Sequence, residues 1–209
     1  MGQVYGLFQV PVIKQRVHNH DEIKKYLMEE VYPGDNEAAP NLIGTEVYTD
    51  YKDKTNSLSQ ERINHLYEPN IRELMADMEF PDTANWHVNV DSWYNFSRKG
   101  GYQHMHDHVG GPLQIMWSGI HYAVFDPEHQ TTNFTNPQAS LIRSIWPTMN
   151  KADLPPYCDD LDVALRADEG EMIWFPPYLN HYVQKQESDK LRCTVAINLT
   201  VFDHPILGK

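Results

Sequence analysis

The side chains best able to do chemistry in this chain are histidines, and three of them crowd together at His104, His106 and His108. Residues i and i+2 of a β-strand point to the same face of a sheet. His106 and His108 could therefore bind one metal ion together, while Asp107 between them would point away. Because neutral imidazole binds iron, copper, nickel and zinc, this cluster predicts a metal site.

Two residues further along the chain make the kind of metal site that is predicted more specific. His181 offers a third imidazole, and Arg192 follows it by eleven positions. An arginine guanidinium presents a planar fork of N–H donors that matches a carboxylate. Three histidines with this arginine would suit an iron centre that binds a dicarboxylate beside the metal. Without Arg192, the histidines would indicate only a metal.

The spacing leaves other sets of ligands open. His104 with His106 fits strand geometry as well as His106 with His108 does. Asp107 would become a ligand if this segment formed a turn instead of a strand. The chain holds 11 histidines in all, so a chance cluster in an exposed polar loop is a further interpretation.

The whole chain predicts one domain over residues 1–209, long enough to bury a hydrophobic core. Its net charge of −12 argues against nucleic acid as a partner, because phosphate binding needs clustered lysines and arginines. No stretch approaches the roughly 18 apolar residues of a membrane helix. The two cysteines, Cys158 and Cys193, form no CxxC motif, and no signal peptide is evident. We therefore expect a cytoplasmic protein with no membrane partner.

Residues 1–85 predict a strand and helices that pack on the rest of the chain. The expected elements are a strand at Val4–Val12, a helix from about Asp21 to Pro33-Gly34, and a short strand at Thr45–Thr49. Ser57 and Gln60 form a capping box for a second helix. That helix reaches Met78, and Pro69 either kinks it or divides it.

Residues 86–202 predict short strands separated by turns. The expected strands are Trp86–Asp91, Leu113–Phe125, Ala139–Ile145, Glu171–Phe175, His181–Gln184 and Leu191–Val201. Arg98-Lys99-Gly100-Gly101 is expected to be a turn. Helices followed by many short strands favour a mainly β fold with flanking helices (α+β), in which a β-sandwich or jelly roll carries the helices on its outside.

Several short motifs in this second part occur in an order known from one superfamily. They are Trp93-Tyr94-Asn95, Gly100-Gly101-Tyr102-Gln103, His106-Asp107-His108, Trp117–Tyr122, Gly170–Pro177 followed by His181, and Arg192-Cys193-Thr194 running to Asn198. In these motifs the chain resembles the iron(II)/2-oxoglutarate-dependent oxygenases. It is most similar to a small, uncharacterised, prolyl-hydroxylase-like group found in phage and marine bacteria. The resemblance is detailed over residues 86–202 and covers the N-terminal third only in outline.

This resemblance implies a double-stranded β-helix that binds one Fe(II) ion. The implied metal ligands are His106, His108 and His181. Arg192 would bind the distal carboxylate of 2-oxoglutarate, and Thr194, two residues further on the same strand face, would add a hydroxyl. The remaining implied contacts to 2-oxoglutarate are Asn95 and Tyr122, whose alternative role is in the scaffold. Trp93, Trp117 and Trp174 are expected to be core residues, and His104 and His121 to lie near the site without binding metal.

The implied reaction is hydroxylation of a C–H bond, coupled to conversion of 2-oxoglutarate and O2 to succinate and CO2. The substrate would be a peptide, with peptidyl proline as one option, or a small molecule; a dimer is one option for the oligomer. The superfamily usually has a carboxylate where this chain has His108, although the small group often reads His-x-His. Two alternatives follow: a three-histidine, cupin-like metalloenzyme that does not use 2-oxoglutarate, or a non-catalytic jelly-roll module of the binding or virion-associated kind.

Overall fold

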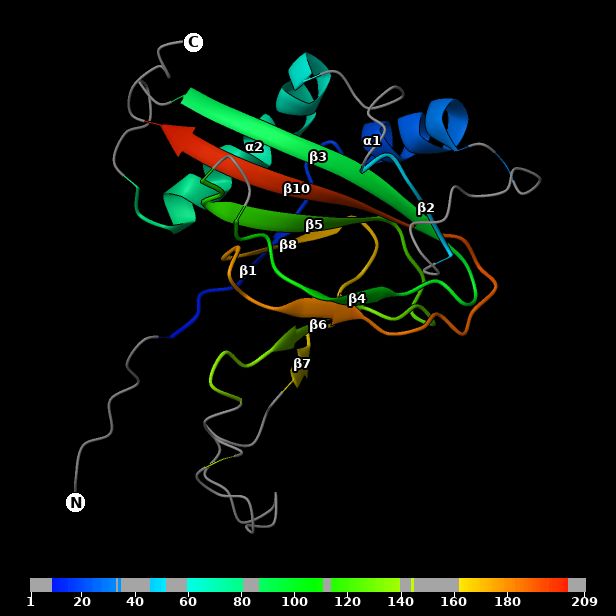
Figure 1. Ribbon diagram of the computed structural model, residues 1–209. Coiled ribbons are helices and arrows are strands. Elements are labelled where there is room, and N and C mark those ends of the chain that lie inside the picture. Colours follow the sequence, from blue (N-terminus) through cyan, green and yellow to red (C-terminus); the bar gives the residue numbers. More distant parts are fainter. Residues whose placement is uncertain are drawn as a thin grey trace.

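A computed structural model describes residues 9–32, 34, 46–51, 60–80, 87–110, 114–139, 144 and 162–202 (Figure 1). In chain order the elements are β1 (Ile13–Arg16), α1 (His20–Tyr26), the π-helical turn η1 (Leu27–Val31), β2 (Val47–Thr49), α2 (Gln60–Asp77), β3 (His87–Ser97), β4 (Gln103–His106), β5 (Trp117–Val124), β6 (Thr132–Thr135), β7 (Asp162–Ala164), β8 (Glu171–Phe175), β9 (His181–Val183) and β10 (Arg192–Phe202). None of the helices described here is long and apolar enough to cross a membrane.

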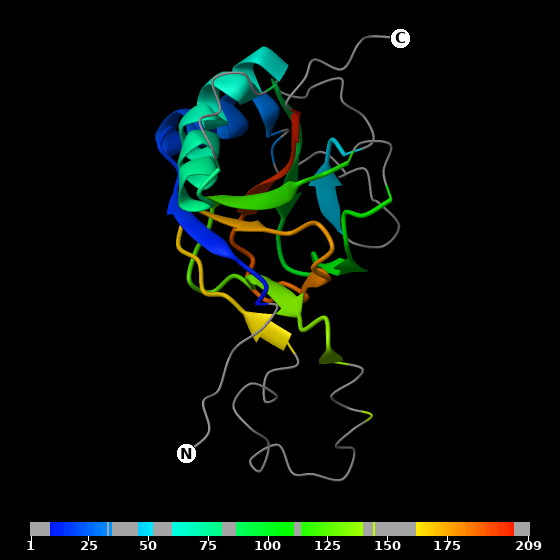
Figure 2. The same ribbon diagram turned by 90° about the vertical axis from the view of Figure 1, so that its left-hand side faces the viewer.

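The strands form two antiparallel sheets. The larger sheet has the order β1-β8-β5-β10-β3-β2, and the smaller one has the order β4-β9-β6-β7. The two views show the helices on the outer face of the larger sheet and the smaller sheet beneath its inner face (Figures 1 and 2). The larger sheet is thus covered on both faces, and the mainly β, jelly-roll architecture expected from the sequence is confirmed.

The central strand β10 has one apolar face in the core and one polar face toward the smaller sheet. Its side chains alternate in direction, and Val195, Ile197 and Leu199 are fully buried in the core beneath the helices. The intervening residues face the smaller sheet, and they include polar Thr194 and Asn198. A central strand covered on both faces is normally apolar on both. The polar inner face of β10 therefore marks the functional side of the sheet.

The structure corrects the expected first strand, and of the two alternatives at Pro69 it excludes a division of the helix. The first strand is Ile13–Arg16 and not Val4–Val12; residues 9–12 form no strand, and residues 1–8 lie outside the described part. Pro11 offers no N–H for a sheet ladder, so pairing with β8 begins after it, at Ile13. Helix α2 runs through Pro69 as one helix. Buried side chains on both sides of the proline, Leu66 and Leu74 among them, outweigh its helix-breaking cost of about 3 kcal/mol. The expected cap at Ser57 lies outside the described residues.

Three expected strands of the second part agree closely with the structure, and two others differ. β3 continues to Ser97 beyond the expected end at Asp91, and β5 begins only at Trp117, since residues 114–116 form no strand. β8 has the predicted bounds, and β9 and β10 differ from theirs by no more than one residue at either end. The turn at Arg98–Gly101 is present, and its Gly100 adopts a φ of 97°, which favours glycine. The expected strand at Ala139–Ile145 is wrong at its described residues, since Ala139 and Ser144 are both helical. The short strands β6 and β7 were not expected, because their strand form depends on pairing with distant segments.

Candidate metal centre and cosubstrate site

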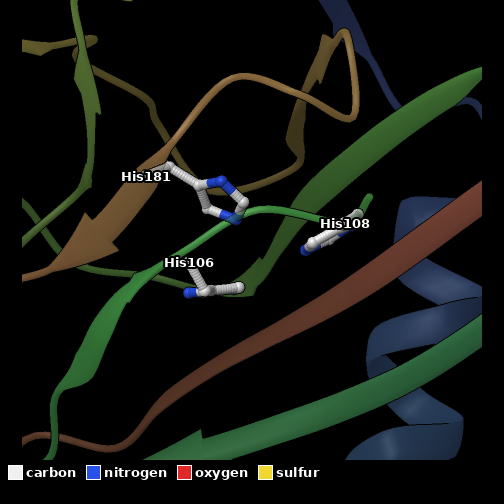
Figure 3. Close-up of side chains that lie close together, drawn as sticks. All are labelled: His106, His108 and His181. Atoms are coloured by element: carbon white, nitrogen blue, oxygen red, sulfur yellow. The ribbon is translucent and has the colours of Figure 1, made fainter. Parts of the chain in front are cut away.

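Three histidine side chains converge between the two sheets. Any two of the ring nitrogens that His106, His108 and His181 can offer to a metal lie within 4.8 Å of each other. Figure 3 shows the three side chains close together. His106 ends β4 and His181 begins β9, and the two residues are directly opposite in the antiparallel ladder. The ladder explains why two residues so far apart in sequence share one site.

The position of His108 beside the other two histidines does not follow from strand geometry. β4 ends at His106, so the rule for residues i and i+2 of a strand does not apply to His108. Two hydrogen bonds hold the bend instead. The His108 N–H donates to the carbonyl of Pro177 at 2.9 Å, and the Val109 N–H donates to Asp107 Oδ1 at 3.0 Å. The second bond is an Asx-turn, which occupies the Asp107 carboxylate.

The structure therefore separates the candidate ligands that the sequence left open. His106, His108 and His181 form the group that could hold a metal, and neither Asp107 nor His104 belongs to it. The exposed His104 ring packs edge-on against Tyr102 at 4.9 Å and lines a different hollow. The Asp107 segment does form a turn, but its carboxylate stabilises that turn.

Two of the three imidazoles are held in the tautomer that a metal requires. His106 Nδ1 lies 2.7 Å from the carbonyl oxygen of His104, and His181 Nδ1 lies 2.9 Å from that of Leu179. A carbonyl oxygen can only accept a hydrogen bond. Both Nδ1 atoms must therefore carry the proton, which leaves each Nε2 with a free lone pair for a metal.

His108 is held in the same tautomer by two side chains. Its Nδ1 lies 2.6 Å from Asn198 Oδ1 and 2.8 Å from Ser118 Oγ, and Ser118 Oγ donates to Asn198 Oδ1 at 2.9 Å. Asn198 of β10 and Ser118 of β5 are direct cross-strand neighbours. Sequence reasoning missed both residues. The signal that could have found them is a polar residue within a largely apolar central strand, β10 for Asn198 and β5 for Ser118.

Burial keeps two of these imidazoles neutral. It lowers the pKa of His181 to about 3, with the neighbouring His106 acting in the same direction. It also lowers the pKa of His108, against the effect of the hydrogen bond to Asn198. A neutral imidazole is the form that binds a metal, so both side chains are ready to do so at neutral pH.

The residues expected to contact 2-oxoglutarate lie in one row on the inner face of the larger sheet. Thr194 of β10 is directly opposite Asn95 of β3 on one side and Tyr122 of β5 on the other. Arg192 precedes Thr194 by two positions, at the start of β10. The Tyr122 hydroxyl donates to Thr132 Oγ1 at 3.0 Å, so the smaller sheet already holds it in place.

Arg192 is the most informative member of this row. Its side chain is only 4% exposed, and its Nε has no hydrogen-bond partner among the described residues. Two aromatic rings face the guanidinium, whose carbon lies 6.0 Å from the Tyr122 ring centre and 5.7 Å from that of Phe125. A buried charge without a partner costs several kcal/mol. The site is therefore suited to an anion that brings a carboxylate to Arg192.

A pocket of about 490 Å³ opens beside His106 and His108. Trp93 is buried, as expected of a core residue, and it also lines this pocket, with its ring centre 5.7 Å from that of His108. Trp117 and Trp174 do lie in the core beneath the helices.

His121 is not near the site: it is fully buried on the opposite face of the sheet, where its Nδ1 lies 2.9 Å from the Tyr67 hydroxyl of α2. Strand alternation places His121 there because Tyr122 faces inward.

A comparison with family sequence models identifies the family of this chain. The sequence model of the family described as "Putative 2OG-Fe(II) oxygenase" matches residues 91–198, just over half of the chain. No curated protein matches the chain significantly.

Solved structures share the fold at low sequence identity. An oxidoreductase of the 2OG-Fe(II) oxygenase family from Burkholderia pseudomallei has a TM-score of 0.58 and 12% identity, over 92% of this chain and 84% of its own. A prolyl-4-hydroxylase from Pseudomonas putida has a TM-score of 0.58 and 11% identity, over 92% and 94%. HygX from Streptomyces hygroscopicus, with nickel and 2-oxoglutarate bound, has a TM-score of 0.56 and 9% identity, over 91% and 82%. The match over residues 91–198, which contain the row of Asn95, Tyr122 and Arg192 and all three histidines, shows that the chain belongs to the 2OG-Fe(II) oxygenase family.

Proposed function

We propose that this Fe(II)- and 2-oxoglutarate-dependent dioxygenase binds its metal through Nε2 of His106, His108 and His181, and its cosubstrate through Arg192. The observation that carries the proposal is the buried Arg192 guanidinium, whose Nε has no partner among the described residues. It lies on the same inner face as Asn198, which holds His108. A dicarboxylate between these points would satisfy the guanidinium at one end and reach the metal at the other.

The neighbouring residues would position the cosubstrate. The Thr194 hydroxyl and the Asn95 carboxamide flank the path from Arg192 to the histidines, and both side chains are buried. A carboxylate that is desolvated needs such donors. Tyr122, fixed by Thr132, forms the apolar wall beneath the cosubstrate with its ring. Bound Fe(II) would supply the reaction of 2-oxoglutarate with O2, which gives succinate and CO2 and is coupled to hydroxylation of a C–H bond.

The third histidine changes the charge of the centre. Three neutral imidazoles leave a divalent metal at +2, whereas two imidazoles and a carboxylate would leave it at +1. Dianionic 2-oxoglutarate would bring two negative charges, one paired with Arg192 and the other close to the metal. We infer that cosubstrate binding and metal binding support each other more strongly here than they would beside a carboxylate ligand.

The substrate assignment is also a proposal. A peptidyl proline is the first substrate to test, since the fold is shared with a prolyl-4-hydroxylase. Hydroxylation in the cytoplasm would place the enzyme where thiols stay reduced, and Cys193 is a free, buried thiol.

The deciding experiment measures metal and cosubstrate separately. Anaerobic protein with Fe(II) should develop a visible absorption band only when 2-oxoglutarate is added. Arg192→Ala should weaken 2-oxoglutarate binding while Fe(II) binding is retained, and Arg192→Lys should restore part of it, because lysine keeps the charge but not the planar fork. Equal loss of metal and cosubstrate in Arg192→Ala would contradict the assigned role. If the protein bound the metal but its absorption did not change with 2-oxoglutarate, the result would favour a three-histidine metalloenzyme that does not use 2-oxoglutarate. His108, which stands where the superfamily usually has a carboxylate, is the reason for testing this alternative.

A further inference from the structure

Arg192 lies at the point where the sheet stops pairing its strand on one side. As the first residue of β10, Arg192 is opposite Ser97 of β3. On the other side, the described pairing of β10 with β5 begins only at Cys193, which is opposite Val124, and its register shifts before Thr194. The ladder to β5 therefore does not hold the backbone that leads into Arg192.

A buried histidine connects the two segments beyond the end of this ladder. His129 lies between β5 and β6 and is only 6% exposed. Its Nδ1 accepts a hydrogen bond from the Asp126 N–H at 2.9 Å, and its Nε2 lies 3.2 Å from the carbonyl oxygen of Lys190. Lys190 precedes Arg192 by two residues. The His129 side chain thus joins the turn that follows β5 to the segment that enters β10, as a ladder hydrogen bond would.

Both hydrogen bonds require one neutral tautomer of His129. A backbone N–H can only donate, and a backbone carbonyl oxygen can only accept. Nδ1 must therefore carry a lone pair, and Nε2 must carry the proton that it donates to the Lys190 carbonyl. Burial lowers the pKa of His129 against the effect of this hydrogen bond, and the positive charge of Arg192 lowers it further. The ring therefore keeps this tautomer at neutral pH.

The His129 ring also reaches the guanidinium through an aromatic side chain. The buried Phe125 ring packs edge-on against His129 with ring centres 5.4 Å apart, and its centre lies 5.7 Å from the guanidinium carbon of Arg192. Lys190 Nζ also bridges the two segments, through ion pairs with Asp126 at 2.8 Å and Glu128 at 3.3 Å. These pairs are largely exposed and contribute little. His129 is thus the buried part of the connection.

We propose that His129 is a positioning residue for the cosubstrate. By donating to the Lys190 carbonyl, it holds the start of β10, and with it the Arg192 guanidinium, where the distal carboxylate of 2-oxoglutarate binds. The inference rests on the proposed function, because it takes Arg192 to be the carboxylate-binding residue. A group that is already held in its binding position costs less to order when the ligand arrives. Loss of this hydrogen bond should therefore weaken recognition of the distal carboxylate and leave metal binding unchanged.

The test compares two ligands that differ only at the end that would contact Arg192. 2-Oxopentanoate has a methyl group where 2-oxoglutarate has its distal carboxylate. Each ligand is titrated into anaerobic protein with Fe(II), and the visible absorption band gives its dissociation constant. The ratio of the two constants measures recognition of the distal carboxylate, because a general effect on the metal centre changes both equally. The parent protein should prefer 2-oxoglutarate, and Arg192→Ala should lose most of this preference.

Variants of His129 separate its two hydrogen bonds. In His129→Gln, the carboxamide nitrogen can take the place of Nε2 and donate to the Lys190 carbonyl. The shorter side chain of His129→Asn keeps at most the bond to Asp126, and His129→Leu keeps neither. We expect His129→Asn and His129→Leu to lose about threefold to tenfold of the preference, the contribution of one neutral hydrogen bond, and His129→Gln to retain most of it. Glu128→Gln is the matched control, because it changes an exposed ion pair of the same turn and should leave the preference unchanged.

The outcomes separate this inference from the proposed function, with thermal unfolding identifying the folded variants. An unchanged preference in folded His129→Asn or His129→Leu would overturn the inference. An equal loss in His129→Gln would also overturn it, because the effect would then come from general disruption of the turn. Failure of the proposed function would show differently: the parent protein would develop no 2-oxoglutarate-dependent band, or Arg192→Ala would keep the full preference, and either result would overturn both.

Discussion

Removing the Asn198 carboxamide should weaken metal binding without unfolding the protein. Asn198 Oδ1 accepts from His108 Nδ1 at 2.6 Å and from Ser118 Oγ at 2.9 Å. Loss of a hydrogen-bond partner behind a metal ligand costs about 10-fold to 100-fold in affinity, which is about 1.4 to 2.8 kcal/mol. In Asn198→Ala, Ser118 Oγ at 2.8 Å can still accept from His108. We therefore expect about a tenfold loss for the single variant and nearer a hundredfold loss for Asn198→Ala with Ser118→Ala.

The assay is a titration of the metal-free protein with Co(II), followed by absorption, with thermal unfolding as the measure of folding. Asn89→Ala is the matched control, since Asn89 lines the same pocket from β3 and makes no hydrogen bond to a described histidine. It should bind Co(II) like the parent protein. Asn198→Asp should bind at least as tightly as the parent protein, because a carboxylate accepts the His108 N–H more strongly and adds a negative charge.

Two results would refute this reasoning. If Asn198→Ala bound Co(II) as tightly as the parent protein, the hydrogen bond would not prepare His108 for a metal. If Asn198→Asp lost as much affinity as Asn198→Ala, the loss would come from packing and not from the missing acceptor. The pair of variants therefore distinguishes a positioning role from a merely structural one.

Three further predictions concern the other face of the larger sheet. Burial lowers the pKa of His121 from 6.5 to about 3. Between these two pH values, His121 is protonated in the unfolded chain and stays neutral in the folded protein. Because of this group, the free energy of unfolding of the metal-free protein should fall by about 1.4 kcal/mol for each unit that the pH is lowered. Urea titrations at several pH values should show a smaller dependence of this free energy on pH for His121→Gln than for the parent protein. An equal dependence in the two proteins would contradict the prediction. Gly119→Ala should cost about 1–3 kcal/mol in urea unfolding, because a Cβ there would lie 2.6 Å from Trp174 Cε3; unchanged stability would contradict it. Burial raises the pKa of the Cys193 thiol, so peptide mapping should find Cys193 labelled by a thiol reagent only after unfolding, and labelling of the native protein would disprove it.

Local apolar patterns made part of the fold predictable. Strands β8 and β10 were found almost to the residue, since each carries a run of β-branched and aromatic residues that forms a strand in any sheet. β6 has the polar sequence Thr-Asn-Phe-Thr, and it is a strand only because β9 and β7 pair with it. Pro69 likewise could not be judged from its own segment, because the helix persists through packing against distant strands.

For the candidate site, the sequence by itself determined the chemical identities: three imidazoles, a guanidinium and a hydroxyl in an order typical of one oxygenase superfamily. Only the tertiary structure decided which of the neighbouring residues belong together. It grouped His106 with His108 and excluded Asp107, because a turn bonded to Pro177 and Val109, and not a strand, sets their directions. It also supplied Asn198 and Ser118 behind His108, since the meeting of two strands 80 residues apart in sequence is a property of the sheet and not of either segment.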